Sequence, residues 1–381
     1  SIAAHLDLFD EVLASDGRDN LKGRRKADRL VERFGAGAFE YLGDAAADLP
    51  VFEAAGSASL VGAGAALRRR AASRVPIART LADRPVASVR LRAWVRALRL
   101  HQWAKNLLLF VPLVAAHRAL EPALLVAAAA GFLAFSLCAS AVYLLNDLLD
   151  LAADRAHPTK RERPFASGAL PAAAGVAMAV LLLAEGLVIG AFLPAGFMTA
   201  LLAYLGANAA YNLGLKRVAI ADVVLLAGLY AVRVVAGGAA TGIPISPWLL
   251  GFSLFFFLNL AFLKRYIDVR RVAEAGGTVV PGRDYRASDL PLLGAMGIAA
   301  GYLAVVVLAL YVQSDHVVSL YRHPRALWLA APLVAYWTSR AWLVAHRGRM
   351  NDDPVVFALR DPVTWGIAAV GLALGAAATL V

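Results

Sequence analysis

The chain has 381 residues, of which 60% are hydrophobic and 17% charged, with a mean hydropathy of +0.64. This composition excludes an ordinary soluble globular protein and indicates an integral membrane protein. The net charge of +11 is concentrated in particular loops between apolar segments, so we expect no nucleic-acid partner. The single cysteine, Cys138, excludes an internal disulfide.

Residues 1–63 are polar and predict a small α/β unit. Short apolar stretches at 10–14, 38–42 and 58–62 predict strands, and the pattern from Arg24 to Phe34 predicts a helix. The sequence starts in the middle of this pattern, so we expect an upstream portion to have been lost.

Three short motifs in this unit resemble those of the haloacid-dehalogenase phosphatase superfamily. They are Val12-Leu-Ala-Ser15-Asp-Gly, Asn20-Leu-Lys-Gly-Arg-Arg-Lys26 and Tyr41-Leu-Gly-Asp44-Ala-Ala-Ala-Asp48. The resemblance implies that Ser15 and Lys26 correspond to phosphate-binding residues, and Asp44 and Asp48 to magnesium ligands. The superfamily's nucleophile motif, Asp-x-Asp-x-Thr, is absent upstream of Ser15, so we expect a partial domain without phosphatase activity. A generic Rossmann-like fragment with surface acids is the alternative.

Residues 64–100 are rich in arginine and contain Pro76 and Pro85. This composition predicts a basic linker that leads into a juxtamembrane helix. The basic residues beside Trp94 and Leu98 suggest that this helix lies along lipid headgroups.

Residues 101–381 are expected to form the membrane domain. Apolar runs of about 20 residues, the length that crosses a bilayer, predict nine spans at 104–117, 123–145, 169–191, 193–213, 218–240, 247–264, 290–312, 326–345 and 362–381. The basic loops alternate with short connections that carry little positive charge, and only the loop at 313–325 is discordant. The positive-inside rule therefore places the basic loops, and the N-terminal unit, on the cytoplasmic side of the membrane.

A run of acids follows the second predicted span directly, in the sequence Asn146-Asp147-Leu-Leu-Asp150-Leu-Ala-Ala-Asp154. At 100° per residue the four polar side chains fall within about 100° of one another on a helix. Hard oxygen ligands on one face are suited to Mg²⁺, which usually keeps positions open for water or substrate phosphates. The alternative is a helix cap followed by a solvated charged turn.

This motif, at the cytoplasmic end of the second of nine spans, resembles the UbiA superfamily of intramembrane prenyltransferases. The resemblance covers residues 95–381 and implies an all-α membrane fold, a ring of helices around a cytoplasm-facing cavity. It also implies that Mg²⁺ is held by two acidic motifs. The second motif departs from the common pattern, because Lys264-Arg265-Tyr-Ile-Asp268 supplies a single acid. We therefore expect Asn146, Asp147, Asp150, Asp154 and Asp268 to be metal ligands, and the four aspartates to serve catalysis through the metal.

This form of the second motif resembles that of one branch of the superfamily. Members of that branch transfer 5-phosphoribose from 5-phosphoribosyl 1-diphosphate to decaprenyl phosphate. Three phosphate-bearing groups would then need cations, and the helix ends supply them. The candidate phosphate-binding residues are Lys105, Arg163, Lys216, Arg217, Lys264, Arg265, Arg283 and Tyr285. The candidate pocket residues are Gln102, Asn106, Tyr143, Tyr211, Asn212, Asp222 and Arg233.

The sequence leaves two other functions open. One is a conventional prenyl transfer from a prenyl diphosphate to an aromatic acceptor, and the other is a transporter or flippase, since intramembrane charges also suit substrate passage. The expected partners are a polyprenyl phosphate, 5-phosphoribosyl 1-diphosphate and membrane lipids. The sequence also leaves the oligomeric state open.

Overall fold

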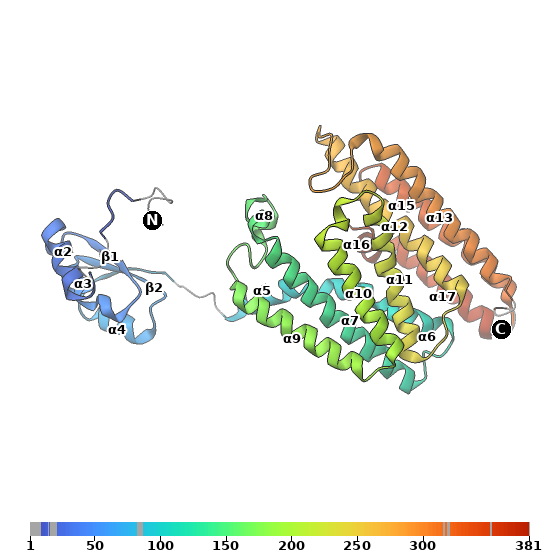
Figure 1. Cartoon of the computed structure of the whole chain (residues 1–381), viewed down its shortest axis with the longest axis horizontal. Coiled ribbons are helices and arrows are strands. Elements are labelled where there is room, and N and C mark those ends of the chain that lie inside the picture. The colour runs from blue at the N-terminus through green and yellow to red at the C-terminus, as the bar shows by residue number, and fades with distance from the viewer. Residues whose placement is uncertain are drawn as a thin grey trace. The chain divides into compact units, whose positions relative to one another are not determined.

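The computed structural model describes residues 9–13, 15, 21–81, 87–314, 317, 321–350 and 353–380. The chain divides into two compact units, with the boundary between Arg92 and Ala93. Figure 1 shows an N-terminal unit with a small sheet and a larger unit built from helices.

The N-terminal unit contains a parallel three-stranded sheet with strand order β1-β2-β3. Its core consists of apolar side chains from the central strand and the helices, with Phe52, Leu60 and Ala71 fully buried. The elements are α2 (Arg24–Phe34), β1 (Glu40–Gly43), η1 (Ala46–Asp48), α3 (Leu49–Ala54), β2 (Ser57–Val61), α4 (Ala65–Ala72) and β3 (Ile77–Leu81). The predicted α/β character is confirmed, and so is the predicted helix.

Two expectations for this unit were wrong. Residues 10–13 form no strand, and residue 14 lies outside the described residues. The stretch expected to be a linker contains β3, so the α/β unit extends well beyond residue 63. β3 pairs with β2 through its backbone and exposes most of its side chains, which allows Arg79 at this edge of the sheet. Its composition therefore looks like that of a polar linker.

The larger unit is helical. Among the described residues, proline at the first helical position starts four α-helices of this unit, where the missing N–H has no partner to lose. The elements are α5 (Ala87–Leu98), η2 (Leu100–Phe110), α6 (Val111–Ala115), α7 (Pro122–Leu149), α8 (Leu151–Ala156), η3 (Lys160–Glu162), α9 (Ala172–Ala191), α10 (Ala195–Leu213), η4 (Leu215–Arg217), α11 (Ala221–Thr241), α12 (Pro247–Glu274), η5 (Ala287–Asp289), α13 (Leu290–Val312), η6 (Pro324–Leu329), α15 (Ala330–His346), α16 (Pro354–Arg360) and α17 (Pro362–Leu380).

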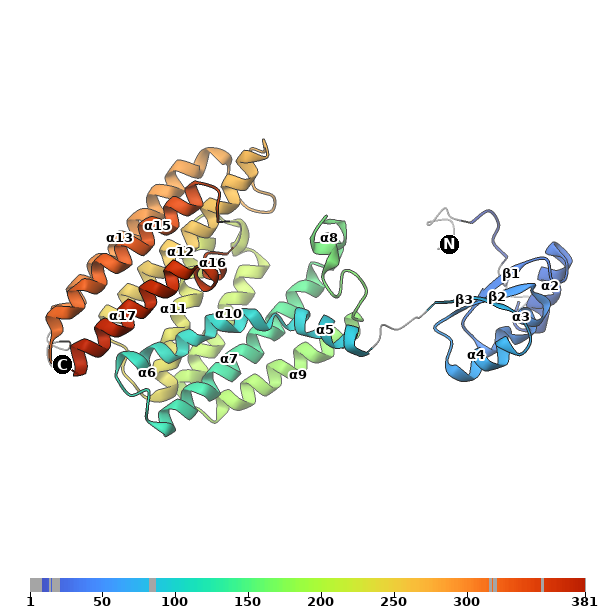
Figure 2. The ribbon, with the colours of Figure 1, turned by 180° about the vertical axis from the view of Figure 1, so that it is seen from behind.

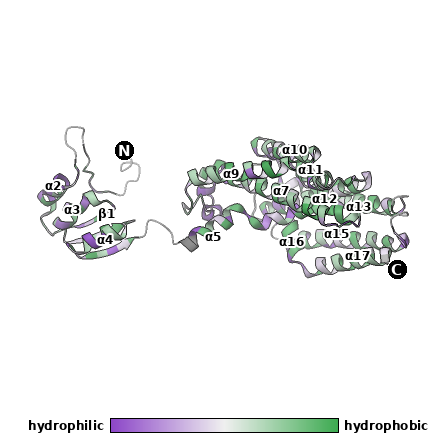
Figure 3. Ribbon diagram, turned by 90° about the horizontal axis from the view of Figure 1, so that it is seen from below, coloured by the Kyte–Doolittle hydropathy of each residue, from purple (hydrophilic) through white to green (hydrophobic). Residues whose placement is uncertain are grey.

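Within the described part of the chain, six helices are long and apolar enough to cross a membrane: α7, α9, α11, α12, α13 and α17. Figure 3 shows the hydrophobic colouring that extends along these helices. The other three expected spans correspond to η2 with α6, to α10 and to α15, and all are helical. α15 has 17 residues, fewer than the ~20 that a straight crossing needs. The protein is therefore a multi-pass membrane protein, and the prediction of nine spans is confirmed for six.

The long helices lie side by side, as the two opposite views in Figures 1 and 2 show. α11 approaches η2 so closely that a Cβ on Gly237 would lie 2.0 Å from the Leu109 carbonyl oxygen, so only glycine fits there. Because successive helices reverse direction, the end of α7, the start of α11, the end of α12 and the end of α15 lie at the same end of the unit. The polar residues of the candidate site lie here.

Candidate functional site

The acidic motif spans the junction of α7 and α8. α7 ends at Leu149, Asp150 is the junction residue, and α8 begins at Leu151. Asp147 and Asp154 are buried, 3% and 2% exposed, whereas Asn146 is half-buried and Asp150 is exposed. The structure thus brings two of the four predicted ligands together in the protein interior.

Arginines bind both buried carboxylates. Arg163 Nη1 lies 3.1 Å from Asp147 Oδ1 and 2.6 Å from Asp154 Oδ2, and Arg99 Nη2 lies 2.6 Å from Asp147 Oδ1. We call these four residues the Asp147 cluster. One nitrogen bridges two carboxylates that are seven residues apart, so their oxygens already converge on a single positive group. That geometry attracts a cation.

No group of three or more His, Cys, Asp or Glu residues stands ready to hold a metal ion in the part of the chain that the structure describes. The two buried carboxylates are occupied by arginine instead. Asp268 is also paired with an arginine, because Arg265 Nη1 lies 2.7 Å from its Oδ2. The predicted five-residue metal site therefore stays a prediction.

A second cluster surrounds Asp222, at the start of α11. Its carboxylate is fully buried and accepts hydrogen bonds from Arg265 Nη2 at 2.6 Å, Arg283 Nη1 at 3.0 Å and the Tyr285 hydroxyl at 2.6 Å. With Asp268, these residues form what we call the Asp222 cluster. Burial and the hydrogen bond to Asp222 raise the pKa of Tyr285, so its hydroxyl stays protonated and donates.

The backbone is strained next to Asp222. Ile220 has φ of +66°, a left-handed conformation that is costly for a β-branched residue. Its N–H donates to the Tyr285 hydroxyl at 2.7 Å. Arg265 and Tyr285, expected to bind phosphate, are almost fully buried within these contacts. Arg283 is more exposed and also donates to the Tyr211 hydroxyl at 3.2 Å.

Two lysines from distant helices meet at one carboxylate. Lys105 Nζ and Lys264 Nζ lie 3.2 and 3.0 Å from Asp353 Oδ2. Burial alone would raise the pKa of Asp353, but Lys264 and Lys105 outweigh it and hold this pKa well below its ordinary value of 3.8. Asp353 also caps α16 by accepting from Val355 N at 2.9 Å. We call Lys105 and Lys264, together with the Asp353 carboxylate that they share, the lysine pair.

An apolar cavity of about 380 Å³ begins beside the lysine pair, and we call it the tail cavity. Among the described residues that line it, Lys105 is the one with a charge. The wall residues used below are Tyr230, Phe252, Phe256, Phe257 and Trp337, with Pro354 and Val355 next to the lysine pair. Two lysines against one carboxylate leave a net positive charge at this end of an otherwise apolar cavity.

Arg233 lies in the interior of α11 and is 5% exposed. Its Nε donates to Asn106 Oδ1 at 2.8 Å, and its guanidinium lies 4.8 and 5.6 Å from the ring centroids of Tyr204 and Tyr230. Asn106 in turn donates to Ser136 Oγ at 2.9 Å. Tyr230 also lies under Lys105, at 5.7 Å, which connects this network to the tail cavity.

The remaining predicted residues lie near the same helix ends. Tyr143 lies 5.1 Å from the Arg99 guanidinium, and Gln102 is half-buried in η2. Asn212 donates to the Asn208 carbonyl. In η4, Lys216 is half-buried and Arg217 is exposed.

In the N-terminal unit, Ser15 and Lys26 line one cavity of about 260 Å³. Lys26 pairs with Asp48 at 3.3 Å and with the Tyr41 hydroxyl, whereas Asp44 is exposed. This neighbourhood is consistent with the expected phosphate-binding roles, and the haloacid-dehalogenase assignment stays a prediction.

The sequence interpretation missed Asp353 and Arg99 as site residues. Asp353 stands in Asn351-Asp352-Asp353-Pro354, an acidic pair before a helix-starting proline on the side predicted to be cytoplasmic. That placement is a usable signal. Arg99 belongs to the Arg-Leu-His-Gln segment that precedes the first predicted span, but its partner Asp147 is 48 residues away.

These features describe a multi-pass helical membrane protein with buried carboxylates and cations at one end of its helices. The model of the UbiA prenyltransferase family matches residues 107–365, so the chain belongs to that family of transferases. The N-terminal unit lies outside the matched residues.

Individual relatives extend the comparison. The chain is 40% identical over 369 residues to the protein y4nM of Sinorhizobium fredii, which covers 97% of this chain and 71% of y4nM. It is 38% identical over 189 residues to the decaprenyl-phosphate phosphoribosyltransferase of Mycolicibacterium smegmatis, which covers 49% of this chain and 59% of that enzyme. The structure of a UbiA homolog from Archaeoglobus fulgidus bound to DMAPP and Mg²⁺ shares the fold, with a TM-score of 0.56 at 17% identity over 75% of this chain and 98% of that one.

Proposed function

We propose that the protein transfers the 5-phosphoribosyl group of 5-phosphoribosyl 1-diphosphate to a polyprenyl phosphate and releases diphosphate. The observation that carries this proposal is the lysine pair at one end of the tail cavity. A net positive charge beside an apolar cavity suits a molecule with an anionic head and a hydrocarbon tail. A polyprenyl phosphate has both.

The donor needs further cations, because it carries a diphosphate and a separate 5-phosphate. Arg99, Arg163 and Arg283 are partly exposed, and their guanidinium groups can bind phosphate through two parallel hydrogen bonds. The similarity over half of the chain to decaprenyl-phosphate phosphoribosyltransferases supports this donor. Lys216 and Arg217 are further candidates at the same helix ends.

We propose Mg²⁺ as the cofactor, as in the homolog from Archaeoglobus fulgidus that was solved with Mg²⁺. The residues available as metal ligands fit this ion, because the carboxylates of Asp147 and Asp154 already converge on one positive nitrogen. These two residues would hold the ion with Asn146 and Asp150, and we propose Asp268 as a further ligand. When bound, Mg²⁺ would neutralise the departing diphosphate. Arg163, released from the carboxylates, would then bind the donor's phosphates.

The transfer itself is a displacement. An oxygen of the lipid phosphate forms a bond to the anomeric carbon of ribose, while the bond from that carbon to the diphosphate oxygen breaks and its electron pair leaves with diphosphate. The lipid phosphate is already anionic at neutral pH, so the reaction needs no general base from the chain. We expect inversion at the anomeric carbon.

We further propose that this site faces the cytoplasm of a bacterial cell, where a soluble phosphoribosyl donor would be available. The basic loops at the site's end of the helices support that orientation. The N-terminal unit of the same chain resembles a phosphatase that lacks its nucleophile motif, and the fusion of such a unit to this site suits a pathway in which the 5-phosphate is next removed.

A transfer assay tests the proposal. Protein in lipid nanodiscs is incubated with ribose-labelled 5-phosphoribosyl 1-diphosphate, decaprenyl phosphate and Mg²⁺, and the label in the lipid extract is counted. We expect lipid-soluble label that depends on Mg²⁺. Label confined to the aqueous phase, together with prenylation of an aromatic acid from a prenyl diphosphate, would overturn the proposal in favour of conventional prenyl transfer.

A further inference from the structure

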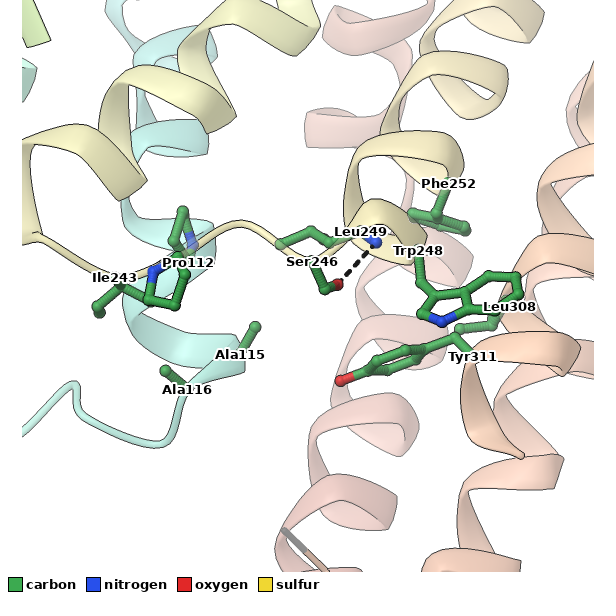
Figure 4. Close-up of a pocket in the computed structure, with 11 residues that line it drawn as sticks. Pro112, Ala115, Ala116, Ile243, Ser246, Trp248, Leu249, Phe252, Leu308 and Tyr311 are labelled. Carbon is green, nitrogen blue, oxygen red and sulfur yellow. Dashed lines mark hydrogen bonds between the residues drawn. The ribbon is translucent and has the colours of Figure 1, made fainter. Parts of the chain in front are cut away.

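A second apolar cavity adjoins the first at a single side chain. The second cavity, of about 200 Å³, lies at the turn between α11 and α12, and we call it the far cavity. Figure 4 shows Trp248, Phe252, Leu308 and Tyr311 on one side of it, opposite Pro112, Ala115 and Ala116. Phe252 lines both the tail cavity and the far cavity.

The two cavities follow one another along the helices. Phe252 precedes Lys264 by twelve residues on α12, which corresponds to about 18 Å along a helix axis. The tail cavity therefore extends from the lysine pair to within about two turns of the start of α12. The far cavity continues from Phe252 to the opposite helix ends, at Ser246 and Tyr311.

The Phe252 ring packs against one aromatic ring that belongs to a larger aromatic cluster. It stacks on Phe256, with ring centroids 5.5 Å apart and an interplanar angle of 14°. Phe256 in turn packs against Phe257 at 5.8 Å and Trp337 at 5.6 Å, and all three line the tail cavity. Turning the Phe252 ring would break its stacking on Phe256, so the ring is held as a partition between the two cavities.

We propose that Phe252 is a specificity-determining residue that sets how much of a polyprenyl tail the protein holds internally. This inference rests on the proposed function, in which a polyprenyl phosphate binds with its head at the lysine pair. Inside the tail cavity, each added isoprene unit increases affinity because it packs closely against fixed aromatic walls. Beyond Phe252 the tail must turn out into lipid, where a further unit gains little, since lipid is equally apolar.

Removal of the ring would join the two cavities. In Phe252→Ala, a longer tail can pass into the far cavity and bury further units there. In Phe252→Trp, the larger ring projects further into the tail cavity and shortens it. If Phe252 is a partition, a smaller side chain should lengthen the part of the tail that the protein holds, and a larger one should shorten it. General damage to the fold would instead lower the affinity for tails of every length.

The test measures binding directly, separately from transfer. Affinities of polyprenyl phosphates from geranyl to decaprenyl are determined by native mass spectrometry of the full chain released from nanodiscs. In the wild type we expect affinity to rise with length and then level off. Phe252→Ala should shift the levelling point to longer chains, with roughly tenfold tighter binding of the longest tails, and Phe252→Trp should shift it to shorter ones.

Leu254→Ala is the matched control. Leu254 lies two residues further along α12, is 41% exposed and lines neither cavity. A levelling point that stays the same in both Phe252 variants and in the control would overturn the inference. If the protein transfers no phosphoribose but the levelling point still moves with residue 252, the proposed function fails while the inference stands. Phe252→Leu provides a smaller change should the alanine variant fail to fold.

Discussion

Replacement of Asp222 by asparagine should destabilise the helical unit strongly. The substitution keeps the shape of the side chain and removes the charge that compensates two arginines. Asp222 and Arg265 are both 0% exposed and are joined at 2.6 Å, and Arg283 lies 3.0 Å away. Arg265 would keep Asp268 at 2.7 Å, but that carboxylate is 33% exposed and lies on the other side of the guanidinium.

The size of the effect follows from burial. Removing one partner of a fully buried ion pair costs about 3–5 kcal/mol, because the remaining charge is left without compensation in a medium of low dielectric constant. At roughly 2 °C per kcal/mol for a unit of this size, the midpoint of thermal unfolding should fall by roughly 6–10 °C. Asparagine also has one acceptor oxygen where aspartate has two, so it cannot accept from both the Tyr285 hydroxyl and the arginines as Asp222 does.

Unfolding is followed by intrinsic tryptophan fluorescence of the purified protein in detergent, with Glu274→Gln as the control. Glu274 pairs with Arg270 at 2.7 Å but is 58% exposed, so its loss should shift the midpoint by less than about 2 °C. An Asp222→Asn variant that unfolds at the same temperature as the wild type and the control would refute the assignment of Asp222 as the buried counter-ion.

Three further predictions concern the site and its charges. Lys105→Met should raise the KM for the lipid acceptor roughly tenfold in transfer kinetics, with less change for the donor, because a charged contact to phosphate is lost. Lys160→Met, on the exposed surface of η3, should change neither KM. Asp154→Asn should lower Mg²⁺-dependent transfer about 10- to 100-fold at fixed Mg²⁺, whereas the control Glu162→Gln should not. Equal activity of the two variants would show that Asp154 does not belong to the metal site. Asp353→Asn should destabilise the protein at pH values above 3.8, because the lowered pKa belongs to the folded state. In unfolding experiments the difference from wild type should shrink progressively as the pH falls from 3.8 towards the lower pKa of the folded state, and a difference that grew in acid would contradict the pairing of Asp353 with the two lysines.

The order of apolar segments and the acidic motif could be predicted from the sequence, because both depend on neighbouring residues. The helix from Arg24 to Phe34 and the long spans appear at the expected places. β3 could not be found in this way, because backbone pairing with β2 defines it rather than the periodicity of its side chains.

The ion-pair partners of the charged groups could not be predicted from neighbouring residues in the sequence either. Lys105 and Asp353 are 248 residues apart, and only the packing of their helices brings them together. Asp222 and Arg265 became a buried pair for the same reason. Most charged residues of the Asp147 cluster, the Asp222 cluster and the lysine pair are among those singled out from the sequence, but the sequence did not show which carboxylate compensates which cation.

A single reaction with competing substrates tests the central claim most directly. The wild-type protein receives 5-phosphoribosyl 1-diphosphate, decaprenyl phosphate, decaprenyl diphosphate, 4-hydroxybenzoate and Mg²⁺ together, and mass spectrometry identifies the lipid products. The proposed function predicts decaprenyl phosphate that has gained a phosphoribosyl group, with the aromatic acid unchanged. A prenylated aromatic acid, with decaprenyl phosphate of unchanged mass, would contradict it.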